Sequence, residues 1–579
     1  MHTHSQRYGD PFRGPPFSQT FVVPKPVPRT LLFTISPLQG PRFSPRPRHT
    51  PTTFLVECPP RDAQRPRLSK MELNVAVSIL FYVFLVVTCT VGIAFVVFTW
   101  FLYRFNRKYG HLPCPRPTSF FTGHLSHFNA VAKKLDFPPL LLMYQWTREL
   151  GPVFYLRFVL QPMVVCCDSK AVKEVCLDSR HLKPQSMYVG FYSVFGERFM
   201  GNGLISQTDH EKWHTRRALL NPAFNRKYLM QMMDLFNDSA TRLRDHLAPL
   251  ADGKTLVRML DHFNDVTLDV IAKVGFDMDV NAVERPDCPF PSAVALALEG
   301  MDVIFKQPMM MMDPRSKARK YRRSVRDAIK LVRKYGKDCI EQRRAAKKRG
   351  DELPKDILTC ILEVEDDLCN GQNIDTADMI DEFGTFFVAG QDTTSNLLAF
   401  TLLESGRHED VAKRLKAEVD EVLGNKPVIE YSDLPKLEYM SRVFKETMRL
   451  NPPVSGVIRD LACDVHSSGY IIPKGSNIFF GTYLTSRQEE YFEDPLLFNP
   501  DRFIPTDELP RHLYAYFPFA IGQRNCIGQQ LALIESKVIL AKLLQSFDFR
   551  LEQSQRHVLL SNVTNKPFDR CKNYISLRD

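Results

Sequence analysis

Residues 73–103 carry no charged side chain and contain the run VAVSILFYVFLVVTCTVGIAFVVFTWFLY. This stretch is longer than the roughly 20 apolar residues that an α-helix needs to cross a bilayer. Lipid cannot hydrogen-bond the backbone, so a single apolar segment that crosses it must be helical. The sequence therefore predicts one transmembrane helix over residues 71–103.

The flanks of this run predict its orientation. Trp100 and Tyr103 suit a membrane interface, and three basic residues follow within positions 104–108. Positive flanks stay on the cytosolic side, so we expect everything after the run to face the cytosol. Basic residues at positions 65–70 oppose this orientation. A cleaved signal peptide is the alternative, but the apolar run is too long and shows no clear cleavage site before the basic residues.

Residues 1–70 have the composition of a disordered segment. They contain fourteen prolines and show no apolar periodicity, so they cannot bury enough surface to fold. After the apolar run, residues 112–117 (LPCPRP) form a stiff, extended connector. The sequence thus predicts a disordered Pro/Arg-rich extension (1–70), a transmembrane helix (71–103), a basic flank with a proline hinge (104–117) and one large folded domain (118–579).

The charge distribution argues against a nucleic-acid-binding protein, and the cysteine spacings argue against a zinc site or a disulfide scaffold. The formal net charge is +11, but residues 1–70 hold nine Arg and two Lys against three acids and so account for +8. The remainder is ordinary and no nucleic-acid motif accompanies it, so we expect no nucleic-acid partner. The thirteen cysteines are scattered without paired spacings, which predicts reduced thiols instead of a zinc site or a disulfide scaffold.

Residues 519–528 (FAIGQRNCIG) place one cysteine, Cys526, between two glycines and just before a long amphipathic segment. A thiolate is a strongly donating iron ligand, and backbone N–H groups in a tight turn stabilise its charge. Gly522 and Gly528 can adopt backbone conformations that other residues resist. The pattern therefore predicts a loop that presents a cysteine ligand. The alternative is a buried cysteine beside the start of a helix.

Residues 378–405 predict one long buried helix that is interrupted at residues 389–394 (AGQDTT). Gly390 weakens the helix at the point where the hydroxyl of Thr393 can bond within a local kink. Asp392 beside Thr393 is an acid next to an alcohol, a pair that can relay protons into a buried site. A structural role is the alternative, but a polar cluster inside an apolar helix is costly without a purpose.

Residues 229–350 have a helical pattern, and two other stretches do not. Strand-like runs at 153–159 and 162–167 predict a small sheet. Residues 188–205 (YVGFYSVFGERFMGNGLI) are aromatic, glycine-rich and aperiodic, which favours a loop over a pocket instead of a packed helix.

Two side-chain pairs lie on shared helical faces. Trp213 and Arg217 are four residues apart, and Glu446 and Arg449 are three apart. Alone, the first pair indicates an exposed helix with a packed tryptophan. The second pair alone indicates a surface ion pair of small energetic value.

These blocks, in this order, resemble the cytochrome P450 family over residues 112–579. The resemblance implies a mainly α-helical fold with small β-sheets, which binds haem b through Cys526 as the iron ligand. In that family the acid–alcohol pair delivers protons, here Asp392 and Thr393. The other residues that match family positions are Trp213, Arg217, Arg459 and Arg524 for the haem propionates, Phe519 as a screen for the sulfur, and Glu446, Arg449 and Arg502 for a buried structural network.

The resemblance also implies the reaction and the partners. Two electrons from NADPH, passed through NADPH-cytochrome P450 reductase, and one dioxygen would place one oxygen atom in a C–H bond of a lipophilic substrate. The substrate pocket is expected to be apolar with few polar anchors. With its predicted anchor, the enzyme is expected to be a single-pass protein of the endoplasmic reticulum membrane whose catalytic domain faces the cytosol.

Within the family, several stretches resemble the cholesterol 24-hydroxylases: VFGERFMGNGLIS (194–206), FFVAGQDTTSN (386–396), YFEDPLLFNPDRF (491–503) and YFPFAIGQRNCIGQQ (516–530). Carried over by position, the pocket would be lined by Tyr188, Phe191, Met200, Ile205, Ala389 and Thr564. Ser455 stands where those enzymes have a tryptophan, and this difference reshapes the pocket. A sterol is the expected substrate, and another lipid such as a fatty acid, or a xenobiotic, is the alternative.

Two other functions compete with this interpretation. A haem-thiolate isomerase or dehydratase rearranges a peroxide without dioxygen or a reductase, but such relatives tend to lose the acid–alcohol pair. A non-catalytic haem sensor or carrier needs no proton relay and no room for a substrate. The intact pair of Asp392 and Thr393 therefore favours the monooxygenase.

Overall fold

The computed structural model describes residues 70–132, 139–285, 287–368, 375–505, 513–561 and 563–578. The predicted disordered extension lies outside these residues, apart from Lys70. The chain divides into two units, residues 1–85 and 86–579, and the boundary falls inside the first helix.

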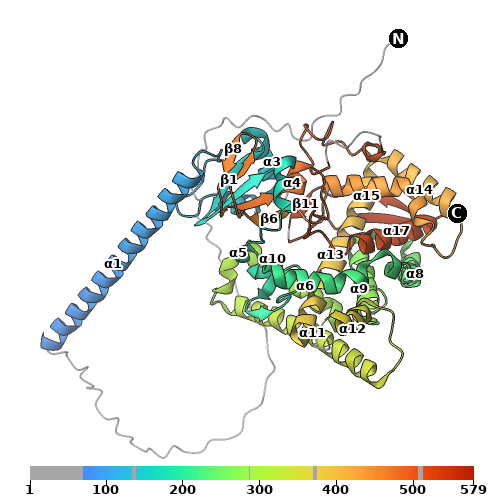
Figure 1. Ribbon diagram of the computed structural model, residues 1–579, viewed down its shortest axis with the longest axis horizontal. Coiled ribbons are helices and arrows are strands. Elements are labelled where there is room, and N and C mark those ends of the chain that lie inside the picture. Colours follow the sequence, from blue (N-terminus) through green and yellow to red (C-terminus); the bar gives the residue numbers. More distant parts are fainter. Residues whose placement is uncertain are drawn as a thin grey trace, which may run out of the picture. The chain divides into compact units, whose positions relative to one another are not determined.

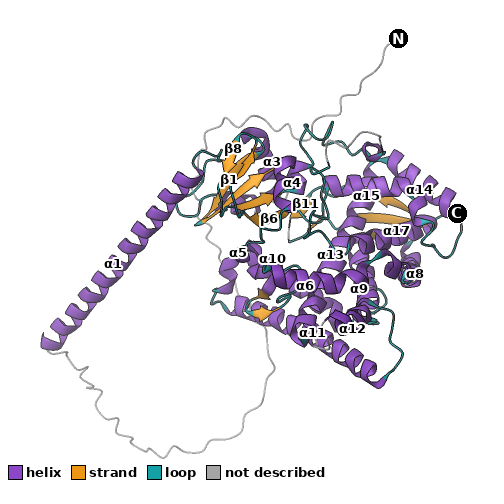
Figure 2. Ribbon diagram, viewed as in Figure 1, coloured by secondary structure: helices purple, strands orange, loops and turns teal. Residues whose placement is uncertain are grey.

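The described residues are mainly helical, as predicted (Figures 1 and 2). The α-helices are α1 (Lys70–Tyr109), α2 (Leu125–Ala132), α3 (Pro139–Leu150), α4 (Ser169–Leu177), α5 (Gln185–Tyr192), α6 (His210–Leu220), α7 (Arg226–Met230), α8 (Met233–Leu247), α9 (Met259–Phe276), α10 (Pro289–Lys306), α11 (Ser316–Arg349), α12 (Ile357–Leu368), α13 (Thr376–Arg407), α14 (Glu409–Leu423), α15 (Glu438–Leu450), α16 (Thr482–Thr485) and α17 (Gln529–Ser546).

The strands form small sheets at the edges of this helical domain. They are β1 (Val153–Phe158), β2 (Gln161–Cys166), β3 (Ser193–Val194), β4 (Glu197–Arg198), β5 (Asp252–Arg258), β6 (Val457–Asp460), β7 (Val465–Ser467), β8 (Tyr470–Ile472), β9 (Asn477–Phe480), β10 (Phe547–Leu551), β11 (Leu559–Ser561), β12 (Asn565–Pro567) and β13 (Lys572–Leu577). The largest sheet has the order β1-β2-β9-β6, with β2 and β9 parallel and the other pairs antiparallel. Its first two strands, β1 and β2, pair antiparallel and confirm the small sheet predicted from the runs at 153–159 and 162–167.

Helix α1 contains the predicted membrane span. Residues Val77–Tyr109 are long and apolar enough to cross a membrane, with a mean hydropathy of 2.6 in their most apolar window. The helix continues past the basic residues that were expected to end the span, because Arg104, Arg107 and Lys108 are compatible with helical backbone in the last turns.

The centre of the domain is helix α13, which packs against α9, α11, α15 and α17. Figure 1 shows this long helix running through the helical part of the domain. Between Met379 and Ser405 every residue is buried except Ala389, Gly390 and Thr393. The helix is continuous, so the predicted interruption is absent. Instead, a Cβ on Gly390 would lie 3.0 Å from Ile271 of α9, and the glycine therefore allows the two helices to pack closely.

The segment 188–205 differs from the predicted loop. Its first residues belong to helix α5, and a short hairpin of β3 and β4 follows. Gly190 lies against Phe305 of α10, since a Cβ there would approach the phenyl ring to 2.9 Å. The glycine that suggested a flexible loop is therefore a packing position, which sequence periodicity alone does not reveal.

A buried ionic network joins α15 to the irregular segment that precedes the Cys526 loop. The Arg449 guanidinium donates to both carboxylate oxygens of Glu446, at 2.6 and 2.8 Å, and to the carbonyls of Ser486 and Pro495. Arg502 donates to the same carboxylate at 3.0 Å. The side chains of Glu446 and Arg449 are 0% exposed. The structure thus brings together the three residues that were expected to form a structural network.

We predict that Glu446→Gln lowers the free energy of unfolding by about 3–5 kcal/mol, because it leaves two arginines without their buried counter-charge. Thermal denaturation of the purified protein in detergent measures the change. The matched control is Glu409→Gln, whose partner Lys413 is equally close at 2.6 Å but exposed to solvent. This control should leave the melting temperature unchanged, and equal effects of the two variants would contradict the prediction.

Candidate functional site

The loop around Cys526 is closed by hydrogen bonds and by two unusual backbone angles. The Cys526 N–H donates to the carbonyl of Phe519 at 2.8 Å. Ala520 and Gly522 have φ values of 57° and 75°. At Gly522 a Cβ would overlap the carbonyl oxygen of Cys176 in α4. A glycine is therefore required there for two independent reasons, its backbone angle and its close approach to a second segment.

The Cys526 sulfur lies among protein atoms but keeps accessible surface. Burial raises the pKa of its thiol, while a hydrogen bond from the Gly528 backbone N–H and the charge of Arg217 lower it. Arg217 donates to the carbonyl and the side chain of Asn525, at 2.7 and 3.0 Å. In this structure Arg217 thus binds the cysteine loop, and its predicted role with a propionate stays a prediction.

Three cations gather beside this loop: Arg524, Arg459 and Lys183. Burial, with the neighbouring Arg459, lowers the pKa of Arg524 to about 10. Burial also lowers the pKa of Lys183, as do the charges of Arg524 and Arg459. Each donates to a backbone carbonyl, on Gln207, Ile458 and Ile205 respectively. Arg459 is buried and the other two are partly buried. Clustered cations that are shielded from water repel one another, so the arrangement favours binding of an anionic group.

Arg524 is held in place but is incompletely satisfied. Its guanidinium lies 4.0 Å from the ring centroid of Trp213, and one terminal nitrogen donates to Gln207 at 2.8 Å. The other terminal nitrogen, Nη2, is buried and finds no hydrogen-bond partner among the described residues. A buried donor without an acceptor is costly, so this atom marks the place where an external acceptor would bind.

On α13, Ala389, Gly390 and Thr393 are half-buried next to the buried Asp392. The Thr393 hydroxyl donates to the carbonyl of Ala389 at 2.7 Å, one turn earlier. The Asp392 carboxylate accepts a hydrogen bond from the hydroxyl of Thr564. Thr564, predicted as a pocket wall, thus contacts the acid directly.

The other predicted pocket residues have different environments. Tyr188 and Phe191 lie on α5 with ring centroids 5.5 Å apart, and Phe191 also contacts Phe305. Ile205 is half-buried, whereas Met200 is fully buried in the main core and is a core residue in this structure. The Ser455 hydroxyl shares hydrogen bonds with Asn565, at 3.1 and 3.3 Å.

Lys183 and Asn565 were missed by the sequence analysis. Lys183 precedes a proline in an irregular segment, and no local pattern marks it as a buried cation. Asn565 donates to the carbonyl of Pro452 and to Ser455, so it joins two segments that are far apart in the chain. Only the tertiary fold brings either residue to the site.

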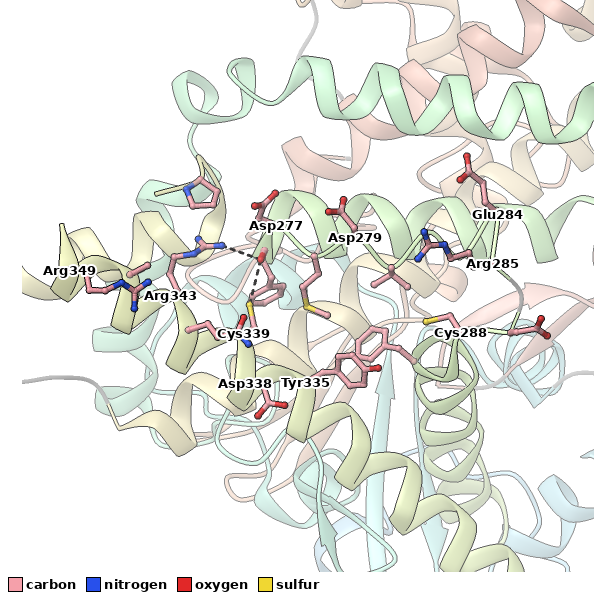
Figure 3. A pocket seen from close by; sticks show the side chains of 18 residues that line it. Asp277, Asp279, Glu284, Arg285, Cys288, Tyr335, Asp338, Cys339, Arg343 and Arg349 are labelled. Atoms are coloured by element: carbon pink, nitrogen blue, oxygen red, sulfur yellow. Dashed lines mark hydrogen bonds between the residues drawn. The ribbon is translucent and has the colours of Figure 1, made fainter. Parts of the chain in front are cut away.

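A separate pocket of about 1140 Å³ lies between α11 and the segment that follows α9 (Figure 3). The predicted site residues do not line it. Its acidic residues Asp277 and Asp279 are paired with Lys273, at 2.7 and 3.0 Å. Arg343, which also lines it, is bound to Asp356 at 2.6 Å. These paired charges indicate a structural surface groove.

The Cytochrome P450 family profile matches residues 113–567. The chain belongs to the cytochrome P450 family. Among its relatives, Cytochrome P450 4d2 of Drosophila melanogaster is 31% identical over 474 residues, which cover 77% of this chain and 90% of the relative. Cytochrome P450 4V2 of Rattus norvegicus is 29% identical over 434 residues, which cover 72% and 81%. The protein is therefore a cytochrome P450 monooxygenase.

Solved structures agree on the fold of this P450. The crystal structure of the cytochrome P450DA heme domain superposes with a TM-score of 0.72, covering 81% of this chain and 97% of that one, at 24% identity. The family implies a haem, and the residues present suit it. An exposed cysteine, a cluster of cations and the unpartnered Nη2 of Arg524 are the groups that a haem iron and its propionates require.

We predict that Gly522→Ala reduces the haem content of the P450. A residue with a Cβ in the left-handed region costs roughly 1–2 kcal/mol, and the overlap with Cys176 adds to that cost. Haem per polypeptide, measured by absorbance, reports the change. Gly469→Ala is the matched control, because its φ is 83° but a Cβ there meets open space. An equal loss of haem in both variants would show that the contact with Cys176 is unimportant.

Proposed function

We propose that this P450 is a membrane-anchored hydroxylase of a lipophilic substrate, supplied with electrons from NADPH by a reductase. One atom of dioxygen enters a C–H bond of the substrate and the other leaves as water, which consumes two electrons and two protons. The observation that carries the proposal is Cys526, which is an exposed cysteine in a hydrogen-bonded loop beside a cluster of cations. The apolar helix α1 supports a membrane location, which we place in the endoplasmic reticulum with the catalytic domain in the cytosol.

Haem b, when bound, supplies the activation of dioxygen and the transfer of one oxygen atom. In our proposal Cys526 holds the iron, and Arg524, Arg459 and Trp213 face the propionates, with Lys183 as a further cation. Arg217 stabilises the thiolate side of the loop through Asn525. Phe519 is half-buried beside the core and limits water around the sulfur.

Asp392 and Thr393 are proposed to deliver the two protons. Asp392 is 9% exposed, so a proton on its carboxylate is shielded from bulk water. The Thr564 hydroxyl holds that carboxylate, and the Thr393 hydroxyl, which donates to the Ala389 carbonyl, would pass the proton onward by exchanging this bond. The small side chain of Ala389, which is half-buried, leaves space beside the pair.

The identity of the lipid is the finer part of the proposal. The expectation of a sterol came from the resemblance to cholesterol 24-hydroxylases. The relatives reported above are instead named Cytochrome P450 4d2 and Cytochrome P450 4V2. Ser455 also replaces the large aromatic wall of those enzymes, and its hydroxyl is occupied by Asn565. We therefore place an open-chain lipid such as a fatty acid ahead of a sterol.

Reconstitution with reductase, NADPH and separate panels of fatty acids and sterols tests the proposal, with products identified by mass spectrometry. We expect hydroxylated fatty acids, and a Cys526→Ala variant should form no product and lack the thiolate signature in its reduced, carbon-monoxide-bound spectrum. Hydroxylation of sterols alone would reverse the order of the two substrate classes. Turnover of a lipid peroxide without NADPH would instead favour an isomerase.

We predict that Asp392→Asn lowers product formation by roughly 10²–10⁴-fold, because an amide cannot transfer the proton. The ratio of product to NADPH consumed should fall as well, since oxygen is then released as peroxide. Asp375→Asn is the matched control, because Asp375 caps the first turn of the same helix by accepting from the Ala377 N–H, a role that asparagine fills equally well. A normal ratio in Asp392→Asn would contradict the assigned role.

A further inference from the structure

The hairpin of β11 and β12 is too short to hold its own shape. Its two strands pair only over residues 559–561 and 565–567. An isolated two-stranded hairpin is marginal in water at best, so its conformation depends on contacts with the rest of the domain. Thr564, which bonds to the proposed proton donor Asp392, lies next to β12 at the end of this hairpin. The placement of the acid therefore depends on what holds the hairpin.

Three consecutive residues at this end each bond to a different part of the domain, and we call them the clasp: Val563, Thr564 and Asn565. The Val563 N–H donates to the Asp302 carboxylate of α10 at 2.7 Å. The Thr564 hydroxyl donates to Asp392 of α13. The Asn565 N–H donates to the carbonyl of Pro453 at 2.7 Å. The clasp thus joins α10, α13 and the segment after α15 at one point.

Asp302 is the side chain that holds the first residue of the clasp. It is half-buried on α10, and its Oδ1 atom accepts the Val563 N–H. Burial raises the pKa of Asp302 and the charge of Asp392 raises it further, whereas the Val563 N–H and the charges of Lys566 and Lys306 lower it. The two carboxyl groups therefore lie close enough to interact. A carboxylate also makes a stronger bond to an N–H than a neutral acceptor does.

The clasp decides which oxygen of Asp392 is available to carry a proton. The Thr564 hydroxyl engages the Oδ2 atom. A hydroxyl donates to the carboxyl oxygen that has no proton, so a proton on Asp392 is directed to Oδ1. The terminal torsion of an aspartate side chain is soft, so a carboxyl that loses this bond turns easily. A shift of the clasp would therefore misplace the proton even though Asp392 itself is unchanged.

We propose that Asp302 is a positioning residue for the proton donor Asp392, and that it acts by holding the Val563 N–H of the clasp. This proposal rests on the role of Asp392 in the proposed function and adds the residue that fixes the orientation of the acid. The acceptor oxygen of Asp302 is the part that holds the clasp. An asparagine at this position keeps that oxygen, and an alanine removes it.

The test compares Asp302→Ala with Asp302→Asn in the full-length enzyme with its haem, reductase, NADPH and the panel of fatty acids. We expect Asp302→Ala to lower the product formed per NADPH consumed by roughly tenfold with little change in KM, because a misplaced acid impairs the chemistry and not the binding of substrate. Asp302→Asn should keep the wild-type ratio.

A second measurement reads the clasp itself, without turnover. Amide hydrogen exchange followed by mass spectrometry should be roughly tenfold faster at Val563 in Asp302→Ala, because the N–H loses its acceptor. Exchange at Val563 should be unchanged in Asp302→Asn.

Asp464→Ala is the matched control. The Oδ1 atom of Asp464 accepts the Lys474 N–H at the same distance of 2.7 Å, but this bond lies beside β7 and β8 and does not involve the clasp. The control should speed exchange at Lys474 and leave the ratio of product to NADPH unchanged.

Two outcomes of the turnover assay would overturn the proposal. A normal ratio of product to NADPH in Asp302→Ala would show that the acid does not need the clasp. An equal loss in Asp302→Asn would assign the effect to the charge of Asp302 instead of its acceptor oxygen. If the wild-type enzyme oxygenates no lipid, the proposed function fails, and exchange at Val563 then decides the clasp separately. Unchanged exchange in Asp302→Ala would overturn it.

Discussion

The position of Cys526 depends on a backbone path that a residue with a Cβ cannot follow at Gly522. At this point the chain turns through φ 75° and passes directly against the carbonyl of Cys176. The rest of the loop is then held from outside: Arg217 of α6 binds Asn525, and Arg524 binds Gln207. The sulfur is therefore placed by contacts from three separate segments, which keep it accessible although it lies deep in the protein.

Helix α13 has a different requirement, because it carries polar groups through the apolar core. Gly390 allows α9 to approach closely, which keeps the helix continuous beside Asp392 and Thr393. Near its N-terminal end, the buried Asp381 accepts hydrogen bonds from Arg198 and Arg333. These charge-assisted bonds tie α13 to β4 and α11, because a buried carboxylate without such partners would be too costly to ionise. The helix is thus fixed on the N-terminal side of the proposed proton relay and packed closely against α9 beside it.

The parts of the site that could be predicted from the sequence are those encoded by neighbouring residues. The cysteine loop, the long apolar helix with its acid–alcohol pair and the two strands of a small sheet each have a local pattern, and the structure contains all three elements. Met200 looked like a pocket residue by resemblance, but its burial depends on helices distant in sequence. The position of Lys183 was not predictable, because it depends on the Ile205 carbonyl, which only the fold brings within reach.

Position 455 illustrates how the substrate side and the chemical side of the site are connected. The Ser455 hydroxyl and the carbonyl of Pro452 both bond to the Asn565 side chain, which fixes the start of β12. The preceding residue, Thr564, holds the Asp392 carboxylate. A large side chain at 455 would fill the space near Asn565 and remove one of the bonds that position this turn. The small hydroxyl at 455 therefore influences both the shape of the pocket and the placement of the proton donor, so a change of substrate class in this enzyme is coupled to the geometry of its acid.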